Sequence, residues 1–127
     1  MKQITREWVD KAEADFAAAL ILRRSRKKHS RDIVCFHLQQ CVEKYLKGRM
    51  EEAGLSFPKT HDVLKLLDLV LTVEPMWIVL RPAMSAISVH AVETRYPGRD
   101  TTPAEARSLL LATKRIRATA RAALGLN

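Results

Sequence analysis

The sequence lacks any long apolar run and contains only four glycines and two cysteines among its 127 residues. A helix that crosses a bilayer needs roughly 18 or more predominantly apolar residues, and a signal peptide needs an unbroken apolar stretch near its start. Neither occurs, so we expect no membrane segment and a cytoplasmic protein. There is also no Gly/Ser tract, which argues against a flexible linker or a low-complexity tail. We expect one folded domain over residues 1–127.

The common sequence motifs of catalysis and metal binding are absent as well. There is no glycine-rich phosphate loop, no His-Glu-x-x-His helix and no pair of closely spaced cysteines of the zinc type. Cys35 and Cys41 are six positions apart in one helical pattern, so their Cα atoms lie about 9 Å apart, too far for a disulfide. His37 and Cys41 share a helix face, but no further ligand follows at matching spacing. We therefore expect buried thiols, no metal site and no cofactor.

Strand signals are missing, whereas helical periodicity runs through most of the chain. Strict apolar/polar alternation and Asn-Gly or Asp-Gly hairpin turns do not occur. Apolar residues recur instead at spacings of three and four, which is typical of amphipathic helices. The pattern predicts an all-α, up-and-down bundle of four to five helices joined by short loops.

The first half of the chain contains three predicted helices. The first runs over residues 5–24, and the second starts close to residue 31, with Ser30 as its N-cap. Gly54 is well placed to end this second, central helix. The third covers VLKLLDLVLTV, with Thr60 as a plausible N-cap.

The second half contains two more predicted helices, each opened by a proline. Pro75 fits the first turn of the fourth helix, and Pro82 should kink that helix or restart it. Thr102, Pro103 and Glu105 form a capping box at the start of the last helix, and this is the strongest helix start in the sequence.

The formal net charge is +8, which favours anionic partners such as nucleic acid, nucleotides or acidic proteins. The excess is concentrated in two clusters, Arg23, Arg24, Arg26, Lys27, Lys28 and Arg31, and then Lys114, Arg115, Arg117 and Arg121. Such clusters also occur at solvated helix ends, where cations complement the helix dipole. Both interpretations stay open at this point.

Polar side chains on the central helix supply candidate binding residues. His37, Gln40, Lys44 and Lys47 follow spacings of three, four and three, which places them in one stripe. The stripe could bind a ligand or could simply face solvent. Beside it, Gln39 and Glu43 form an i, i+4 pair that could hydrogen-bond another helix or a loop.

Two further candidate positions lie outside the central helix. His61 could cap the third helix, contact the end of the second, or meet a ligand phosphate as a cation. Arg95 and Tyr96 precede Pro97 in a predicted break between helices, and an arginine beside an aromatic residue suits phosphate pairing combined with base stacking. The ligand-binding candidates are Arg95, Tyr96, His37, Gln40, Lys44 and His61.

Several of these segments, taken together, resemble prokaryotic HEPN domains. The resemblance covers nearly the whole chain and rests on Trp8 with Lys11-Ala12 and Asp15, on Cys35-Phe36-His37-Leu38-Gln39-Gln40 running into Glu43-Lys44 and Leu46-Lys47, on Pro58-Lys59-Thr60-His61-Asp62, and on Arg95-Tyr96-Pro97. It implies a helical bundle that forms a homodimer and binds a nucleotide or RNA. It also implies a small nucleotidyltransferase partner in a toxin/antitoxin-like pair.

The resemblance leaves two alternatives. HEPN ribonuclease toxins are metal-independent and carry an arginine followed four to six residues later by histidine. Here no histidine follows Arg95, and Arg81 precedes His90 by nine positions. Catalysis would therefore require His90 and Arg95 to meet through the tertiary structure. The other alternative is a non-catalytic dimerisation or interaction module.

Overall fold

The computed structural model describes all residues from 1 to 127 and is entirely helical. Its elements are α1 (Gln3–Leu22), α2 (Ser30–Ala53), α3 (Val63–Val70), the 3₁₀ helix η1 (Pro75–Leu80), α4 (Arg81–Glu93) and α5 (Pro103–Ala123). This confirms the predicted all-α class with five α-helices. None of the helices combines the length and the apolar content needed to cross a membrane.

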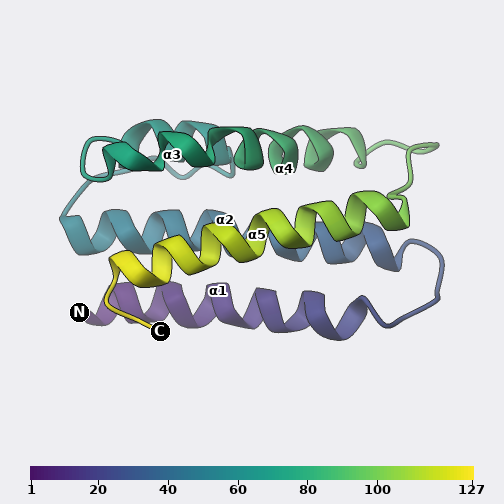
Figure 1. Ribbon diagram of the computed structural model, residues 1–127, viewed down its shortest axis with the longest axis horizontal. Coiled ribbons are helices and arrows are strands. Elements are labelled where there is room, and N and C mark those ends of the chain that lie inside the picture. The colour runs from purple at the N-terminus through teal and green to yellow at the C-terminus, as the bar shows by residue number, and fades with distance from the viewer.

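The long helices run alternately up and down one axis, as predicted (Figure 1). The two termini lie at the same end of the bundle, where α1 begins and α5 ends. Helix α2 is the centre of the packing, because it contacts α1, α3, α4 and α5. Its side chains Leu38, Tyr45 and Met50 are completely buried. A helix surrounded in this way has little face left for solvent.

The start of α2 differs from the prediction in how it is capped. The helix begins at Ser30, but the residue before it, His29, adopts a left-handed conformation with φ of 67° and no side chain caps the helix. The Ser30 hydroxyl instead donates to the Ser25 hydroxyl at 3.0 Å. Ser30 was therefore the wrong N-cap, since its side chain is used to close the α1–α2 connection. At the other end Gly54, with φ of 72°, ends α2 as predicted.

Helix α3 is capped by Asp62 rather than by Thr60. The Asp62 carboxylate accepts hydrogen bonds from the backbone N–H groups of Leu64 and Lys65, at 3.1 and 3.3 Å. The Thr60 hydroxyl accepts from the Asp62 backbone N–H at 3.1 Å, so it stabilises the turn that precedes the cap. The Thr60 prediction was wrong by two residues, because both side chains suit a cap and only the loop geometry selects one.

The proline and capping-box predictions are confirmed. Pro75 opens η1, and Pro82 lies in the first turn of α4, so the chain restarts a helix there instead of bending one. At α5 the Thr102 hydroxyl accepts from the Glu105 backbone N–H at 3.1 Å, and the Glu105 carboxylate accepts from the Thr102 N–H at 2.9 Å. Arg99 also donates to both oxygens of Glu105, which ties the preceding loop to the first turn of α5.

Both cysteines are free and buried, as predicted. Burial away from water raises the pKa of Cys35 to about 11 and that of Cys41 to about 12. A thiol attacks or binds metals as the thiolate. Neither cysteine is therefore a nucleophile at neutral pH.

Candidate functional site

A cavity of about 510 Å³ opens between α2 and α4. It is lined by residues from the first half of α2, from the end of α4 and from the loop before α3, namely His29, Asp32, Ile33, Cys35, Phe36, Gln39, Gln40, His61, Ala91, Thr94 and Arg95. Three of the predicted ligand-binding residues, Gln40, His61 and Arg95, meet here. Gln40 and His61 are 21 positions apart in the sequence, and His61 and Arg95 are 34 apart, so the fold brings the three residues together.

Arg95 supplies an unpaired positive charge at one side of this α2–α4 cavity. It follows the C-cap of α4, is exposed, and makes no ion pair with any carboxylate of the chain. Phe36 supplies an aromatic surface from α2, and 55% of it is exposed although it is a large apolar side chain. An exposed aromatic ring and a free guanidinium that line one cavity are suited to a planar, anionic ligand.

His61 is held at the edge of the cavity by two residues of α2. Its Nδ1 lies 2.9 Å from Glu43 Oε1, and its backbone carbonyl accepts from Gln39 Nε2 at 3.1 Å. Of the two alternatives predicted for Gln39 and Glu43, another helix or a loop, the structure shows the loop. The imidazole itself remains 75% exposed. Its Nε2 edge is therefore available to a ligand.

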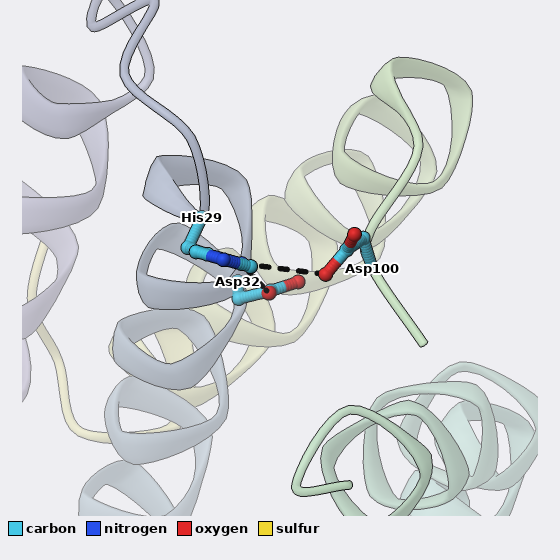
Figure 2. Close-up of side chains that lie close together, drawn as sticks. All are labelled: His29, Asp32 and Asp100. Carbon is cyan, nitrogen blue, oxygen red and sulfur yellow. Dashed lines mark ion pairs between the residues drawn. The ribbon is translucent and has the colours of Figure 1, made fainter. Parts of the chain in front are cut away.

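One histidine and two aspartates, His29, Asp32 and Asp100, lie close together near the start of α2 (Figure 2), and His29 and Asp32 also line the cavity. His29 Nδ1 lies 3.4 Å from Asp32 Oδ2 and 3.3 Å from Asp100 Oδ1. Asp32 Oδ1 is already engaged, because it accepts from the Thr101 backbone N–H at 2.8 Å and from the Thr101 hydroxyl at 2.5 Å. The short distances from His29 Nδ1 to the two carboxylates account for the remaining geometry, and we assign no metal to the cluster.

The Asp32 carboxylate joins α2 to the segment that leads into α5. Burial disfavours its charged form, but the two hydrogen bonds from Thr101 and the contact with His29 outweigh that cost and lower its pKa. Arg31 reinforces the same junction, since its Nε donates to the Thr101 carbonyl at 2.8 Å. The rim of the cavity is therefore fixed by contacts between residues about 70 positions apart.

The family model described as the HEPN domain matches residues 5–123, which is nearly the whole chain. The chain belongs to the HEPN family. Comparison with curated proteins and with solved structures gives no match. HEPN membership supports a role that involves a nucleotide or RNA in general terms, and this agrees with the residues that line the α2–α4 cavity.

Three of the predicted ligand-binding residues of this HEPN protein lie away from the cavity, and two of these, His37 and Lys44, belong to α2. His37 Nδ1 and Lys44 Nζ both contact the buried carboxylate of Asp15 on α1, at 2.8 and 2.5 Å. Their shared partner gives them a role in α1–α2 packing. The predicted polar stripe is thus split, and its fourth member, Lys47, is buried and paired with Glu43 at 3.2 Å.

The catalytic candidates His90 and Arg95 line different cavities. His90 is buried, and its Nε2 lies 2.9 Å from the Thr101 hydroxyl, while its Nδ1 lies 3.8 Å from Glu105. This imidazole therefore joins α4 to the segment that leads into α5. Tyr96 is 67% exposed and does not line the α2–α4 cavity. Phe36 was not among the predicted ligand-binding residues, although it lines the cavity. Its place on a polar side of α2 is the sequence signal that could have identified it.

Acid should destabilise this HEPN protein through three carboxylates. Hydrogen bonds from Arg117 lower the pKa of Glu13, bonds from Thr101 offset burial to lower that of Asp32, and Arg99 lowers that of Glu105 to about 2. A carboxyl whose folded pKa is depressed binds fewer protons when folded, so its stabilising contribution is present above the unfolded pKa and is lost as pH falls through the folded one.

We expect the free energy of unfolding, measured by urea titration, to fall continuously from about pH 5 to about pH 2. Asp32→Asn should flatten part of that slope, because the asparagine no longer titrates. An unfolding free energy that stays constant over this pH range would contradict the assignment of these three ion-paired carboxylates.

Proposed function

We propose that this HEPN protein binds a nucleotide, or an unpaired nucleotide of an RNA, in the α2–α4 cavity. The observation that supports the proposal most is the combination of Arg95, which has no acidic partner, with the exposed ring of Phe36 in one cavity. A cavity of about 510 Å³ is also within the range of roughly 300 to 1,000 Å³ that small-molecule sites occupy.

Each part of a nucleotide has a suitable contact in this arrangement. The base can stack on Phe36, because every base has an aromatic face. The phosphate can pair with the guanidinium of Arg95, whose planar fork matches phosphate oxygens. The Gln40 amide and the His61 imidazole offer hydrogen bonds to the sugar or to the base edge. The net charge of +8 adds a general attraction for the anion.

The proposal predicts a loss of affinity when either anchor is removed. Fluorescence anisotropy would measure binding of a fluorescein-labelled single-stranded oligoribonucleotide, with unlabelled AMP as competitor. Arg95→Ala and Phe36→Ala should each weaken binding about tenfold or more, since a charge-assisted phosphate contact or a stacked base is worth about 1 to 3 kcal/mol and 1.4 kcal/mol corresponds to a factor of about ten.

Arg115→Ala is the matched control, because Arg115 is exposed, unpaired and outside the cavity. It should weaken binding by less than about twofold in moderate salt. If all three variants bind as tightly as the wild type, or if the wild type binds neither probe in low salt, the proposed nucleotide site is wrong. Circular dichroism melting would show that each variant is folded.

We also propose that this protein acts as a homodimer and pairs with a minimal nucleotidyltransferase in a toxin/antitoxin-like pair. The support is the HEPN family together with exposed apolar side chains on α2 and α4, including Phe36, Val89 and Val92. Light scattering that gives a mass near the 14.4 kDa of one chain would contradict the homodimer. We do not propose the ribonuclease activity, because His90 is occupied at the α4–α5 junction.

A further inference from the structure

A second cavity lies where α1 ends and where α2 and α5 begin. Its volume is about 380 Å³, and it shares no lining residue with the α2–α4 cavity. Four arginines from three separate segments surround it, namely Arg23, Arg24, Arg31 and Arg107. Its floor is apolar and includes Ala19, Val34 and Leu110. We call this feature the arginine cavity.

None of the four arginines has an acidic partner. They take part in none of the ion pairs of the chain, and no aspartate or glutamate lines the cavity. Other arginines of the protein, such as Arg99 and Arg117, do pair with glutamates. The cavity therefore gathers cationic groups without neutralising them. Like charges repel, so such an arrangement is unfavourable until an anion enters it.

The cavity is also partly ordered for binding. The Arg31 side chain is oriented because its Nε donates to the Thr101 carbonyl at 2.8 Å, which leaves its terminal NH₂ groups without a protein acceptor. Arg107 projects from the second turn of α5, whose start is held by the Thr102–Glu105 capping box. Guanidinium groups on an apolar, concave surface concentrate their field more than the same groups on a convex one.

We propose that the arginine cavity is a phosphate-binding site, separate from the nucleotide site proposed above. Its ligand chemistry is a phosphate group, carried either by a nucleic-acid backbone or by a small phosphate compound. Several guanidiniums can surround one phosphate and donate paired hydrogen bonds to its oxygens. The proposal does not depend on the α2–α4 cavity, since neither Arg95 nor Phe36 lines the arginine cavity.

The test uses the double variant Arg24→Gln/Arg107→Gln. Neither arginine makes a side-chain hydrogen bond within the chain, so the change should leave the fold intact. The matched control is Lys114→Gln/Arg115→Gln, which also removes two exposed, unpaired charges but lies outside the arginine cavity. Binding of a labelled single-stranded oligoribonucleotide by anisotropy and of inorganic pyrophosphate by calorimetry would be measured for each protein.

We expect the cavity variant to lose affinity about tenfold or more for at least one of the two probes, and the control to lose less than about twofold. A loss for the oligoribonucleotide alone, with a salt slope shallower by about one to two units, identifies backbone phosphates. A loss for pyrophosphate identifies a small phosphate ligand. Equal losses in the two variants, or no loss in either, would overturn the proposal. Retained binding in Arg95→Ala would overturn only the nucleotide site.

Discussion

Replacing Glu43 with glutamine should lower the free energy of unfolding by about 3 kcal/mol, because it leaves a buried lysine without its counter-charge. Glu43 and Lys47 lie one turn apart on α2, and their side chains are only 3% and 8% exposed. The Lys47 ammonium lies 3.2 Å from Glu43 Oε2 and 5.5 Å from the Trp8 ring centre. No other carboxylate contacts Lys47. An uncompensated buried charge is expensive, whereas the intact pair is close to neutral for stability.

The same substitution should also weaken the contact that holds His61. Glu43 Oε1 is the partner of His61 Nδ1 at 2.9 Å, and a neutral amide oxygen in its place accepts a weaker hydrogen bond than the carboxylate does. Urea denaturation would measure the stability of Glu43→Gln beside that of Glu51→Gln, which removes a charge from the same helix without breaking a side-chain hydrogen bond.

The control should change the unfolding free energy by less than about 0.5 kcal/mol. The double variant Glu43→Leu/Lys47→Met should recover most of the lost stability, since it removes both charges and keeps the volume. If the Glu43→Gln variant is as stable as the wild type, Lys47 does not incur the predicted cost of a buried charge without a partner.

Replacing Gly48 with leucine should disrupt the packing of α1 on α2. Gly48 is buried, and a Cβ at this position would lie 3.2 Å from Trp8 Cβ and 3.8 Å from the Thr5 carbonyl oxygen. Both contacts belong to α1, and Trp8 Cβ is fixed to the helix backbone. A leucine adds three further carbons to this contact, so α1 would have to move away from α2. We expect a loss of about 3 kcal/mol, since overpacking of a close interface costs about 1 to 3 kcal/mol and lost α1 contacts add to it.

The matched substitution is Gly48→Ala. Its Cβ requires a shift of only a few tenths of an ångström, and alanine gains about 1 kcal/mol over glycine in a helix interior, so the two effects should nearly cancel. Thermal unfolding followed by circular dichroism would compare the two variants. If the Gly48→Leu variant has the same melting temperature as the wild type, α1 and α2 are not as close as described.

The fold was predictable from sequence because its signals are local. Spacings of three and four fix the helices, Pro82 fixes the restart at α4, and the pair Thr102 and Glu105 fixes the start of α5. The predictions were wrong at positions where contacts between distant segments determine the local structure. The choice of Asp62 over Thr60 as a cap depends on the loop that leads into α3. The burial of Lys47 follows from the central place of α2, which periodicity along one helix cannot reveal.

The candidate site was predictable only in part. Arg95, His61 and Gln40 were identified by residue type and they do meet in one cavity. His37 and Lys44 share the same helix, yet they point to Asp15 on α1 instead. Their partner lies 22 and 29 positions away, and nothing in the local pattern distinguishes a stripe that faces α1 from one that faces a cavity. The arginine cavity required the fold for the same reason, since Arg107 is far from the other three arginines in sequence.

The most direct test of the central claim is a titration of the ¹⁵N-labelled protein with AMP, followed by amide chemical shifts. If a nucleotide occupies the α2–α4 cavity, the largest shifts should occur together at Phe36, Gln40, His61 and Arg95, and Arg95→Ala should require about tenfold more AMP to produce them. Saturable shifts confined to other surfaces, or no shifts at millimolar AMP in low salt, would contradict the claim that this cavity binds nucleotides.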